Sequence, residues 1–411
     1  MKEMFLLGAG ASVEAKVPDS FEMTRVMVDR FDADHYAKKH SQILRFVIGG
    51  LLFQKGGKGE NPFEGINIED LFNAVQLLAR RGESELGPFI NSWHPLLDEF
   101  ESGEISDYEL QELMEILYKP LANIFDNSFD NEELTTRNFG NKLSQGLFFL
   151  RNDYYLQKQL GKQLGKVVKQ IISSRGGEVF HQTTVHMIQK LIEMVWIEDS
   201  SRAQYITPLL KYSTHNDAVI ATLNYDNLVE LAGQSNSIPV DTGFESWSKT
   251  EEFSFNSSSV PLIKLHGSID WALSGGEISD DKPSPYQVIR KINREKKKVE
   301  TYVPAIVFGG KNKLTAKGPF LSLLRAFEQK LASSNRLSVI GYSFRDEHIN
   351  EYIGKWLNRD NQNVLIIINP DESISNNSFL SETGKRGAKR IEFMIENASK
   401  GIESISHASE T

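Results

Sequence analysis

The segment Met4–Ser12, with the sequence MFLLGAGAS, places four apolar residues directly before a turn that contains two glycines. The apolar run predicts a buried strand. Glycines after a strand let the backbone approach a pyrophosphate, and a following helix offers its N-terminal amides to the same anion. The third glycine of the full dinucleotide fingerprint is missing, so an ordinary strand-to-helix turn explains the motif equally well. We therefore expect a strand–turn–helix unit in which Gly8, Ala9, Gly10 and Ser12 are candidates for nucleotide binding.

Further short apolar runs predict the remaining strands of a sheet. They are almost continuous in Val, Ile and Leu, which is typical of a parallel sheet with helices on both faces. The predicted strands are Ala218–Thr222, Leu262–Leu265, Ala305–Phe308, Leu337–Ile340 and Val364–Ile368. Helical patterns separate several of them, at Asn227–Ala232, Pro319–Leu331 and Arg345–Leu357. The pattern predicts an α/β fold with a Rossmann-like, doubly wound parallel sheet.

The middle of the chain has a different texture, with long amphipathic helical periodicity. Helices are predicted at Ile68–Leu78, Tyr108–Leu117 and Val185–Trp196, with one extended helical face from Leu143 to Ile171. The sequence thus predicts a discontinuous Rossmann-like domain, residues 1–60 and 216–411, and a helical insertion domain, residues 61–215. Polar loops are expected at Gln234–Ser259 and Ser274–Lys298.

Composition excludes several classes of protein. The 411 residues are 40% hydrophobic and 25% charged, which is ordinary for a globular chain. No apolar stretch is long enough to span a bilayer, so we expect a cytoplasmic protein without membrane contact. The chain has no cysteine, which removes disulfides, thiolate catalysis and cysteine-ligated zinc, and no metal is expected. A net charge of −9 argues against direct nucleic-acid binding as the main activity.

Polar clusters follow the predicted strands at their carboxyl ends, where ligands bind in open α/β sheets. The clusters after the first strand are Thr222–Asp226 (TLNYD), His266-Gly267, Gly341–Ser343 (GYS) and Asn369. Each has a simpler explanation alone. Asn224 and Asp226 could cap the next helix, His266 could be a buried histidine, and Asn369 precedes Pro370 in a common turn pattern. Their convergence on one edge of the sheet favours a binding site.

The five clusters together resemble the cofactor site of the sirtuin family, which combines GAG-x-S, T-x-N-x-D, HG, G-[TY]-S and a late Asn in this order. The fuller strings Lys264–Trp271 (KLHGSIDW) and Ile340–Asp346 (IGYSFRD) resemble bacterial sirtuin-like NAD hydrolases of antiviral defence. Two departures argue against deacylation. The four-cysteine zinc module of the deacylases is absent, and Pro18–Glu22 (PDSFE) lacks the arginine of their P-D-F-R string.

The resemblance implies NAD as substrate, Asn224, Asp226 and His266 as catalytic residues, and a set of cofactor-binding residues. Asn224 would orient the water and the ribose, Asp226 would contact the nicotinamide side, and His266 suits a general base. The cofactor-binding residues would be Gly8, Ala9, Gly10, Ser12, Thr222, Gly267, Gly341, Tyr342, Ser343 and Asn369. Ser343 would meet a phosphate or the distal ribose, and Asn369 the adenosine ribose.

The expected function is NAD glycohydrolysis that depletes NAD in anti-phage defence. Because an unregulated NAD hydrolase would starve its own cell, control by assembly is expected. The resemblance to stand-alone sirtuin-like subunits implies a homo-oligomer paired with a HerA-type ring ATPase. Two alternatives use the same site: a non-catalytic module that binds NAD or ADP-ribose, and an NAD-dependent deacylase. The nucleophile-elbow and phosphate-loop patterns of serine hydrolases and P-loop ATPases are absent.

Overall fold

The computed structural model describes residues 2–35, 37–61, 64–81, 178–274, 288–292, 304–307, 319–385 and 390–408. The chain divides into two compact units, one made of Met1–Asn73 and Val185–Thr411 and the other of Ala74–Thr184. Most of the predicted insertion, including the helices expected at Tyr108–Leu117 and Leu143–Ile171, lies outside the described residues. The predicted domain boundaries therefore stay a prediction.

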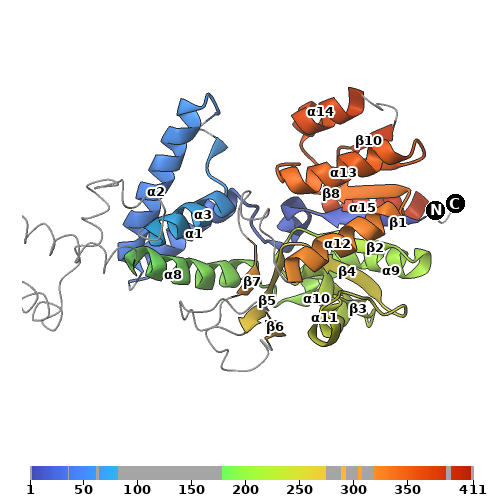
Figure 1. Ribbon diagram of the computed structural model, residues 1–411, viewed down its shortest axis with the longest axis horizontal. Helices are drawn as coiled ribbons and strands as arrows, with labels where there is room; N and C mark the ends of the chain where they lie inside the picture. Colours follow the sequence, from blue (N-terminus) through green and yellow to red (C-terminus); the bar gives the residue numbers. More distant parts are fainter. Residues whose placement is uncertain are drawn as a thin grey trace, which may run out of the picture. The chain divides into compact units, whose positions relative to one another are not determined.

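The first unit is built on a seven-stranded parallel sheet in the order β10-β9-β8-β1-β2-β4-β3. Figure 1 shows the strands following one another from β10 at the top to β3 near the bottom. The bounds are β1 Glu3–Leu7, β2 Val219–Thr222, β3 Val240–Asp241, β4 Val260–Lys264, β8 Arg336–Ile340, β9 Val364–Ile368 and β10 Ile391–Met394. The predicted Rossmann-like parallel sheet is confirmed.

Both faces of this sheet are buried, which explains why its strands are continuously apolar. Successive side chains of β1 point to opposite faces. Phe5 meets the ring of Tyr212 on α9 edge-on, with centroids 5.6 Å apart. The other face forms a core with α12 and α13, and its strand residues include Met4, Leu6, Val219, Ala221, Leu337, Val339, Leu365 and Ile367.

Helices lie between the strands along the chain. Among the described residues they are α1 Glu22–Ala33, α2 Lys38–Gly57, α3 Ile68–Ala79, α8 Glu178–Val195, α9 Thr207–Asn216, α10 Leu228–Ser235, α11 Phe244–Thr250, α12 Pro319–Ala332, α13 Glu347–Arg359, α14 Ser378–Lys385 and α15 Ala398–Ala408. The described 3₁₀ helices are η1 Ala9–Ala15, η6 Ser200–Ile206 and η8 Glu372–Asn376. None of the helices in the described part of the chain has the length and apolar character that a membrane span requires.

Three sequence-based expectations about local structure are corrected. The segment Ser274–Lys298, expected to be a loop, contains the strand β6, Val288–Lys291. The strand predicted at Ala305–Phe308 is β7, Pro304–Ile306, which joins a separate antiparallel sheet in the order β6-β5-β7 rather than the parallel sheet. Its partners are β5, Gly267–Ser274, and β6, Val288–Lys291. The segment Gln234–Ser259 is not a plain loop, because it contains β3 and α11. The ring of Trp247 on α11 is buried and stacks on Phe253 with centroids 5.2 Å apart.

Candidate functional site

One cavity of about 260 Å³ lies at the carboxyl ends of the central strands. The strand order reverses at β1, because the chain adds strands first on its β2 side and later on its β8 side. Such a switch point is where doubly wound sheets bind ligands. The predicted site residues that line the cavity are Gly8, Ala9, Ser12, Asn224, Asp226, His266, Gly341, Tyr342 and Ser343.

The glycines of the first turn are needed because the turn after β8 packs directly against them. A Cβ on Gly8 would lie 2.6 Å from the carbonyl oxygen of Gly341, and one on Gly10 would lie 2.8 Å from Cα of Gly341. The amide of Gly8 donates to Ile340 O at 2.9 Å, and that of Gly10 donates to Gly341 O at 2.8 Å. Both amides are thus used inside the protein, so the turn offers a ligand fewer backbone donors than the sequence suggested.

A chain of side-chain hydrogen bonds crosses the floor of the cavity. Nδ2 of Asn224 donates to Gly8 O and to Oγ of Ser12, each at 2.9 Å. Oγ of Ser12 donates in turn to Oδ2 of Asp226 at 2.7 Å. Thr222 adds to this hydrogen-bond network, because its Oγ1 accepts a hydrogen bond from the amide of Asn224 at 3.0 Å. Two of the five sequence clusters are therefore linked, Gly8–Ser12 in the turn after β1 and Thr222–Asp226 in the turn after β2.

The capping role that the sequence offered for Asp226 is observed, and a second contact ties its side chain to the cavity wall. Its Oδ1 accepts the amide of Leu228 at 3.1 Å, which helps to begin α10, while its Oδ2 holds Ser12 in the cavity wall. Burial raises the pKa of Asp226, although attraction to Lys264 and the hydrogen bond from Ser12 oppose the shift. A buried, polarised carboxyl beside a cavity is a frequent feature of functional sites.

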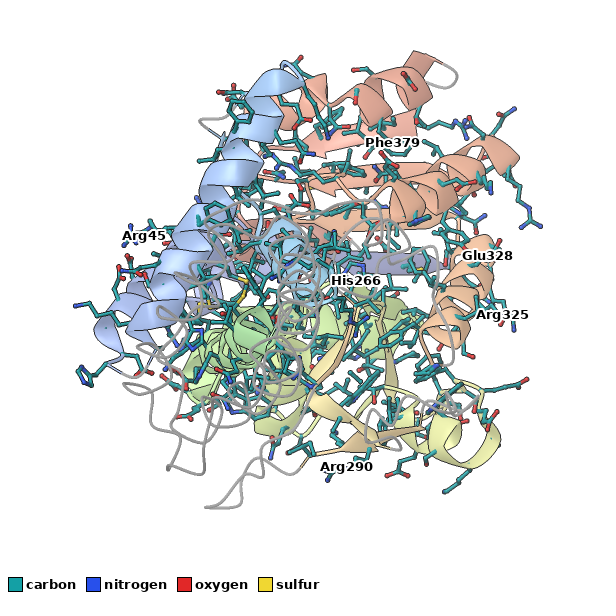
Figure 2. The ribbon with its side chains drawn as sticks, turned by 60° about the vertical axis from the view of Figure 1, so that its left-hand side comes forward. Arg45, His266, Arg290, Arg325, Glu328 and Phe379 are labelled. Atoms are coloured by element: carbon teal, nitrogen blue, oxygen red, sulfur yellow. The ribbon has the colours of Figure 1, made fainter. Side chains whose placement is uncertain are left out.

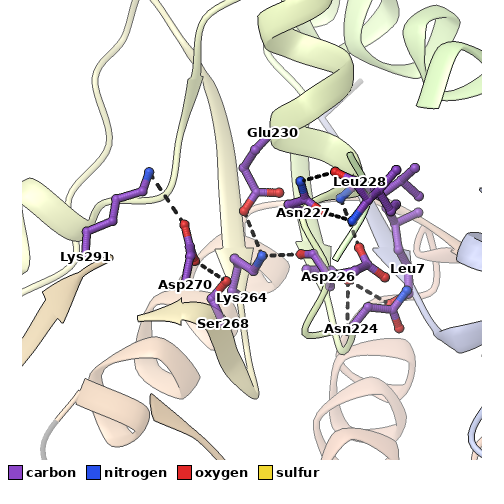
Figure 3. Close-up of polar contacts among 12 residues, drawn as sticks. Leu7, Asn224, Asp226, Asn227, Leu228, Glu230, Lys264, Ser268, Asp270 and Lys291 are labelled. Atoms are coloured by element: carbon purple, nitrogen blue, oxygen red, sulfur yellow. Dashed lines mark hydrogen bonds and ion pairs between the residues drawn. The ribbon is translucent and has the colours of Figure 1, made fainter. Parts of the chain in front are cut away.

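Lys264 lies fully buried behind this turn (Figure 3). Its Nζ donates to Asp226 O at 2.5 Å and to Oε1 of Glu230 at 2.7 Å. Burial acts to lower the pKa of Lys264, but attraction to Glu230 and Asp270 outweighs burial and holds this pKa above its ordinary value. The lysine stays charged and ties the end of β4 to the turn that carries Asn224 and Asp226.

His266 and Asp346 form a buried pair on the opposite wall. Nε2 of His266 lies 3.1 Å from Oδ2 of Asp346, and the two side chains are 8% and 7% exposed. Oδ1 of Asp346 accepts the amides of His348 and Ile349, which caps α13. Figure 2 shows His266 among densely packed side chains, unlike Arg45, which projects from the surface of the molecule. The fold thus orients the imidazole through a hydrogen bond from one of its ring nitrogens to a carboxylate, and the start of α13 holds that carboxylate in place.

The turn between β8 and α13 is held in an uncommon conformation. Phe344 has a φ of 56°, a left-handed value that is rare for a bulky residue. Asn350 fixes this turn, because its Nδ2 donates to Phe344 O at 2.7 Å and its Oδ1 accepts the hydroxyl of Tyr342 at 3.0 Å. The hydroxyl of Tyr342 also accepts the amide of Asp346 at 3.1 Å. Tyr342 is therefore a support of the cavity wall as well as part of it.

Acidic residues from α3 complete the cavity and were missed in the sequence. Glu69 and Asp70 line it, and Oε1 of Glu69 accepts the hydroxyl of Tyr225 at 2.7 Å. Burial raises the pKa of Asp70. In the sequence these residues were only the acidic first turn of an amphipathic helix. Asp346 appeared in the sequence only as the last residue of the string IGYSFRD. A signal for Lys264 was available, since a lysine inside an apolar strand is unusual.

Four predicted residues do not line the cavity: Gly10, Thr222, Gly267 and Asn369. Gly267 has a φ of 79°, and a Cβ there would lie 1.9 Å from Ala305 O, so the close approach of β7 requires a glycine. Oδ1 of Asn369 accepts the amide of Asp371 at 2.9 Å, which is the turn that the sequence offered as an alternative. In the part of the chain that the structure describes, no group of three or more His, Cys, Asp or Glu side chains is arranged to hold a metal ion.

The chain is similar to known proteins over part of its length. Residues 218–386, which are less than half of the chain, match the family model of the SIR2-like domain. A mutant Sir2 homologue in complex with 2'-O-acetyl ADP-ribose is 14% identical, with 57% of this chain and 77% of that chain covered and a TM-score of 0.35. A Sir2 homologue–NAD complex is 15% identical over 56% of this chain and 72% of that chain, with a TM-score of 0.34. The search of curated proteins gave no match. The family model supports a sirtuin-like fold in the second half of the chain.

Proposed function

We propose that this chain is an NAD hydrolase that cleaves the bond between nicotinamide and ribose and releases nicotinamide and ADP-ribose. The observation that carries the proposal is that the His266–Asp346 pair and the Asn224–Ser12–Asp226 chain face one cavity at the switch point of the sheet. The order of the five motifs and the match of residues 218–386 to the SIR2-like domain add support.

The reaction asks little covalent chemistry of the protein. The C1'–N bond of the nicotinamide riboside breaks, its electron pair leaves with the neutral nicotinamide, and a water oxygen bonds to C1'. The transition state resembles the oxocarbenium ion of glycoside hydrolysis. The protein must hold the ribose, limit access of bulk water and place one water at C1'.

Asn224 is suited to position that water and the ribose. Its Nδ2 is committed to Gly8 O and Ser12, which fixes the amide plane. Its Oδ1 accepts no hydrogen bond from any described residue and belongs to a side chain that lines the cavity. A fixed acceptor of this kind orients a water or a ribose hydroxyl without reorganising during the reaction.

His266 acts as the general base, and Asp346 positions it. Because Nε2 lies against the carboxylate of Asp346, Nδ1 is the ring nitrogen left to accept a proton from the water or from a ribose hydroxyl. Asp346 acts through His266 rather than on the substrate. Asp226 and Glu69 add negative charge to the walls around the developing cation, which favours the transition state.

We further propose that the enzyme works in the cytoplasm of a bacterium as an NAD-depleting effector of anti-phage defence, as a homo-oligomer paired with a HerA-type ring ATPase. The motifs shared with stand-alone sirtuin-like subunits support this assignment. Mass measurement in solution and copurification with the protein encoded beside it test the assembly. A monomer that is fully active and indifferent to that partner would contradict it.

Nicotinamide release tests the activity. The purified chain, alone and with the neighbouring gene product, is incubated with NAD, and free nicotinamide is measured. Asn224→Ala and His266→Ala are expected to lower turnover by about a hundredfold or more, while the exposed Arg25→Ala retains it. Release that requires an acylated peptide would instead identify a deacylase. Binding of NAD without release would identify a binding module.

A further inference from the structure

The cavity has a strong imbalance of charge. Four carboxyl side chains line it, Glu69, Asp70, Asp226 and Asp346, whereas Arg345 is the one Lys or Arg side chain among the described residues that do so. A cavity with this charge suits the cationic nicotinamide riboside end of NAD. It does not suit the diphosphate, which carries two negative charges and must find a position where repulsion by these carboxylates is offset.

The glycine turn offers little to offset this repulsion. The amides of Gly8 and Gly10 donate to Ile340 O and Gly341 O, so neither is available to a phosphate oxygen. Ser12 lies in a 3₁₀ helix of only seven residues, and so short a run of peptide dipoles adds little positive charge at its start. A cationic side chain at the cavity would supply the missing attraction for the diphosphate.

The side chain of Arg345 is held in a position from which it can bind a phosphate. Its guanidinium lies over the ring of Phe21, 4.3 Å from the centroid, and the stacking restricts where the flexible side chain can go. Its carboxylate neighbour, Glu64, is 4.0 Å away and about half exposed, so this ion pair is weak and leaves N–H donors along the edge of the guanidinium available. Two residues earlier, exposed Ser343 also lines the cavity.

We propose that Arg345 binds the diphosphate of the dinucleotide at the rim of the cavity, with Ser343 beside it, and so sets the direction in which NAD enters. The cavity volume of about 260 Å³ agrees with this placement, because it is below the range of small-molecule sites, about 300–1,000 Å³, and holds only part of a dinucleotide. The acidic interior receives the nicotinamide riboside, and the guanidinium holds the phosphates outside it. This inference rests on the proposed function.

Affinity for ADP-ribose tests the inference, because this product keeps the diphosphate and lacks the nicotinamide. Calorimetric titrations of the full chain compare wild type with Arg345→Lys, Arg345→Ala and Arg345→Glu. Affinity should fall in that order, with a loss of about 10–100-fold for the alanine variant, since one charge-assisted contact is removed. The difference between wild type and Arg345→Ala should shrink as KCl is raised to about 500 mM, where exposed charges are screened.

Arg25→Ala is the matched control, since Arg25 is an exposed arginine paired with Glu22 that does not line the cavity. It should bind ADP-ribose like wild type. If Arg345→Ala and Arg345→Glu bind ADP-ribose as tightly as wild type, or if the loss is the same for both and independent of salt, Arg345 does not bind the diphosphate. Wild type that binds neither NAD nor ADP-ribose would overturn the proposed function itself, which is a separate result.

Discussion

Replacing Lys264 by Met should destabilise the protein strongly, because it removes the fully buried partner of an ion pair with Glu230, whose side chain is 24% exposed. The lysine is fully buried, and its Nζ serves both Glu230 and the carbonyl of Asp226. Methionine fills a similar volume but leaves the Glu230 carboxylate without its counter-charge. Burial already raises the pKa of Glu230, and attraction to Lys264 opposes that shift. Loss of one partner of such a pair costs about 3–5 kcal/mol.

A double-mutant cycle separates the contributions of charge and of packing to this loss of unfolding free energy. In Lys264→Met with Glu230→Leu, neither buried charge remains, and such replacements are often neutral or stabilising. Thermal unfolding should show the midpoint of the single variant lowered by about 6–10 °C, at about 2 °C per kcal/mol. The double variant should recover most of this loss. The exposed pair Lys355–Glu351 is the control, and Lys355→Met should leave the unfolding midpoint close to that of wild type.

The same cycle links stability to the site. The double variant still lacks the lysine that holds Asp226 O, so nicotinamide release should stay low although the fold has recovered. The reasoning is refuted if the double variant is less stable than Lys264→Met alone, or if the single variant melts within about 1 °C of wild type.

Three further predictions concern single residues of the site. Asp346→Asn should lower kcat by roughly 10–100-fold with little change in KM. The amide still caps α13 but no longer provides a carboxylate for His266. An equal kcat in a correctly folded variant would leave Asp346 as a cap only. Burial raises the pKa of Asp226, so its carboxyl stabilises the fold below its ordinary pKa of about 3.9 and loses this contribution as pH rises through the folded value. Asp226→Asn should therefore have a higher melting temperature than wild type at pH 7, and the difference should shrink toward pH 4. Nicotinamide release by this variant should fall. A melting temperature below that of wild type at pH 7 would contradict the expected direction of the stability change. Asn369→Ala should raise KM for NAD with little change in kcat if its amide reads the adenosine ribose, and an unchanged KM would leave it with only its turn contact to Asp371.

The sequence by itself determined the parallel sheet. Strands β1, β2, β4, β8 and β9 were readable because strands buried on both faces are rich in apolar residues at successive positions. The antiparallel strand β5 was not, since its residues Gly267–Ser274 mix polar and apolar types and follow directly on the His266 motif. The short helix α11 was missed because its polar composition resembles a loop, and only packing of Trp247 against Phe253 orders it.

The sequence also placed the candidate site at the strand ends, because parallel strands bring their carboxyl ends to one edge whatever lies between them. The tertiary structure alone decided which of these residues meet. It brought Glu69 of α3 to Tyr225 and Asp346 to His266, contacts between residues that lie 156 and 80 positions apart. It also committed the amides of Gly8 and Gly10 to the turn after β8. Local patterns fix which residues lie at a strand end, but hydrogen-bond partners depend on side-chain packing, which no local pattern encodes.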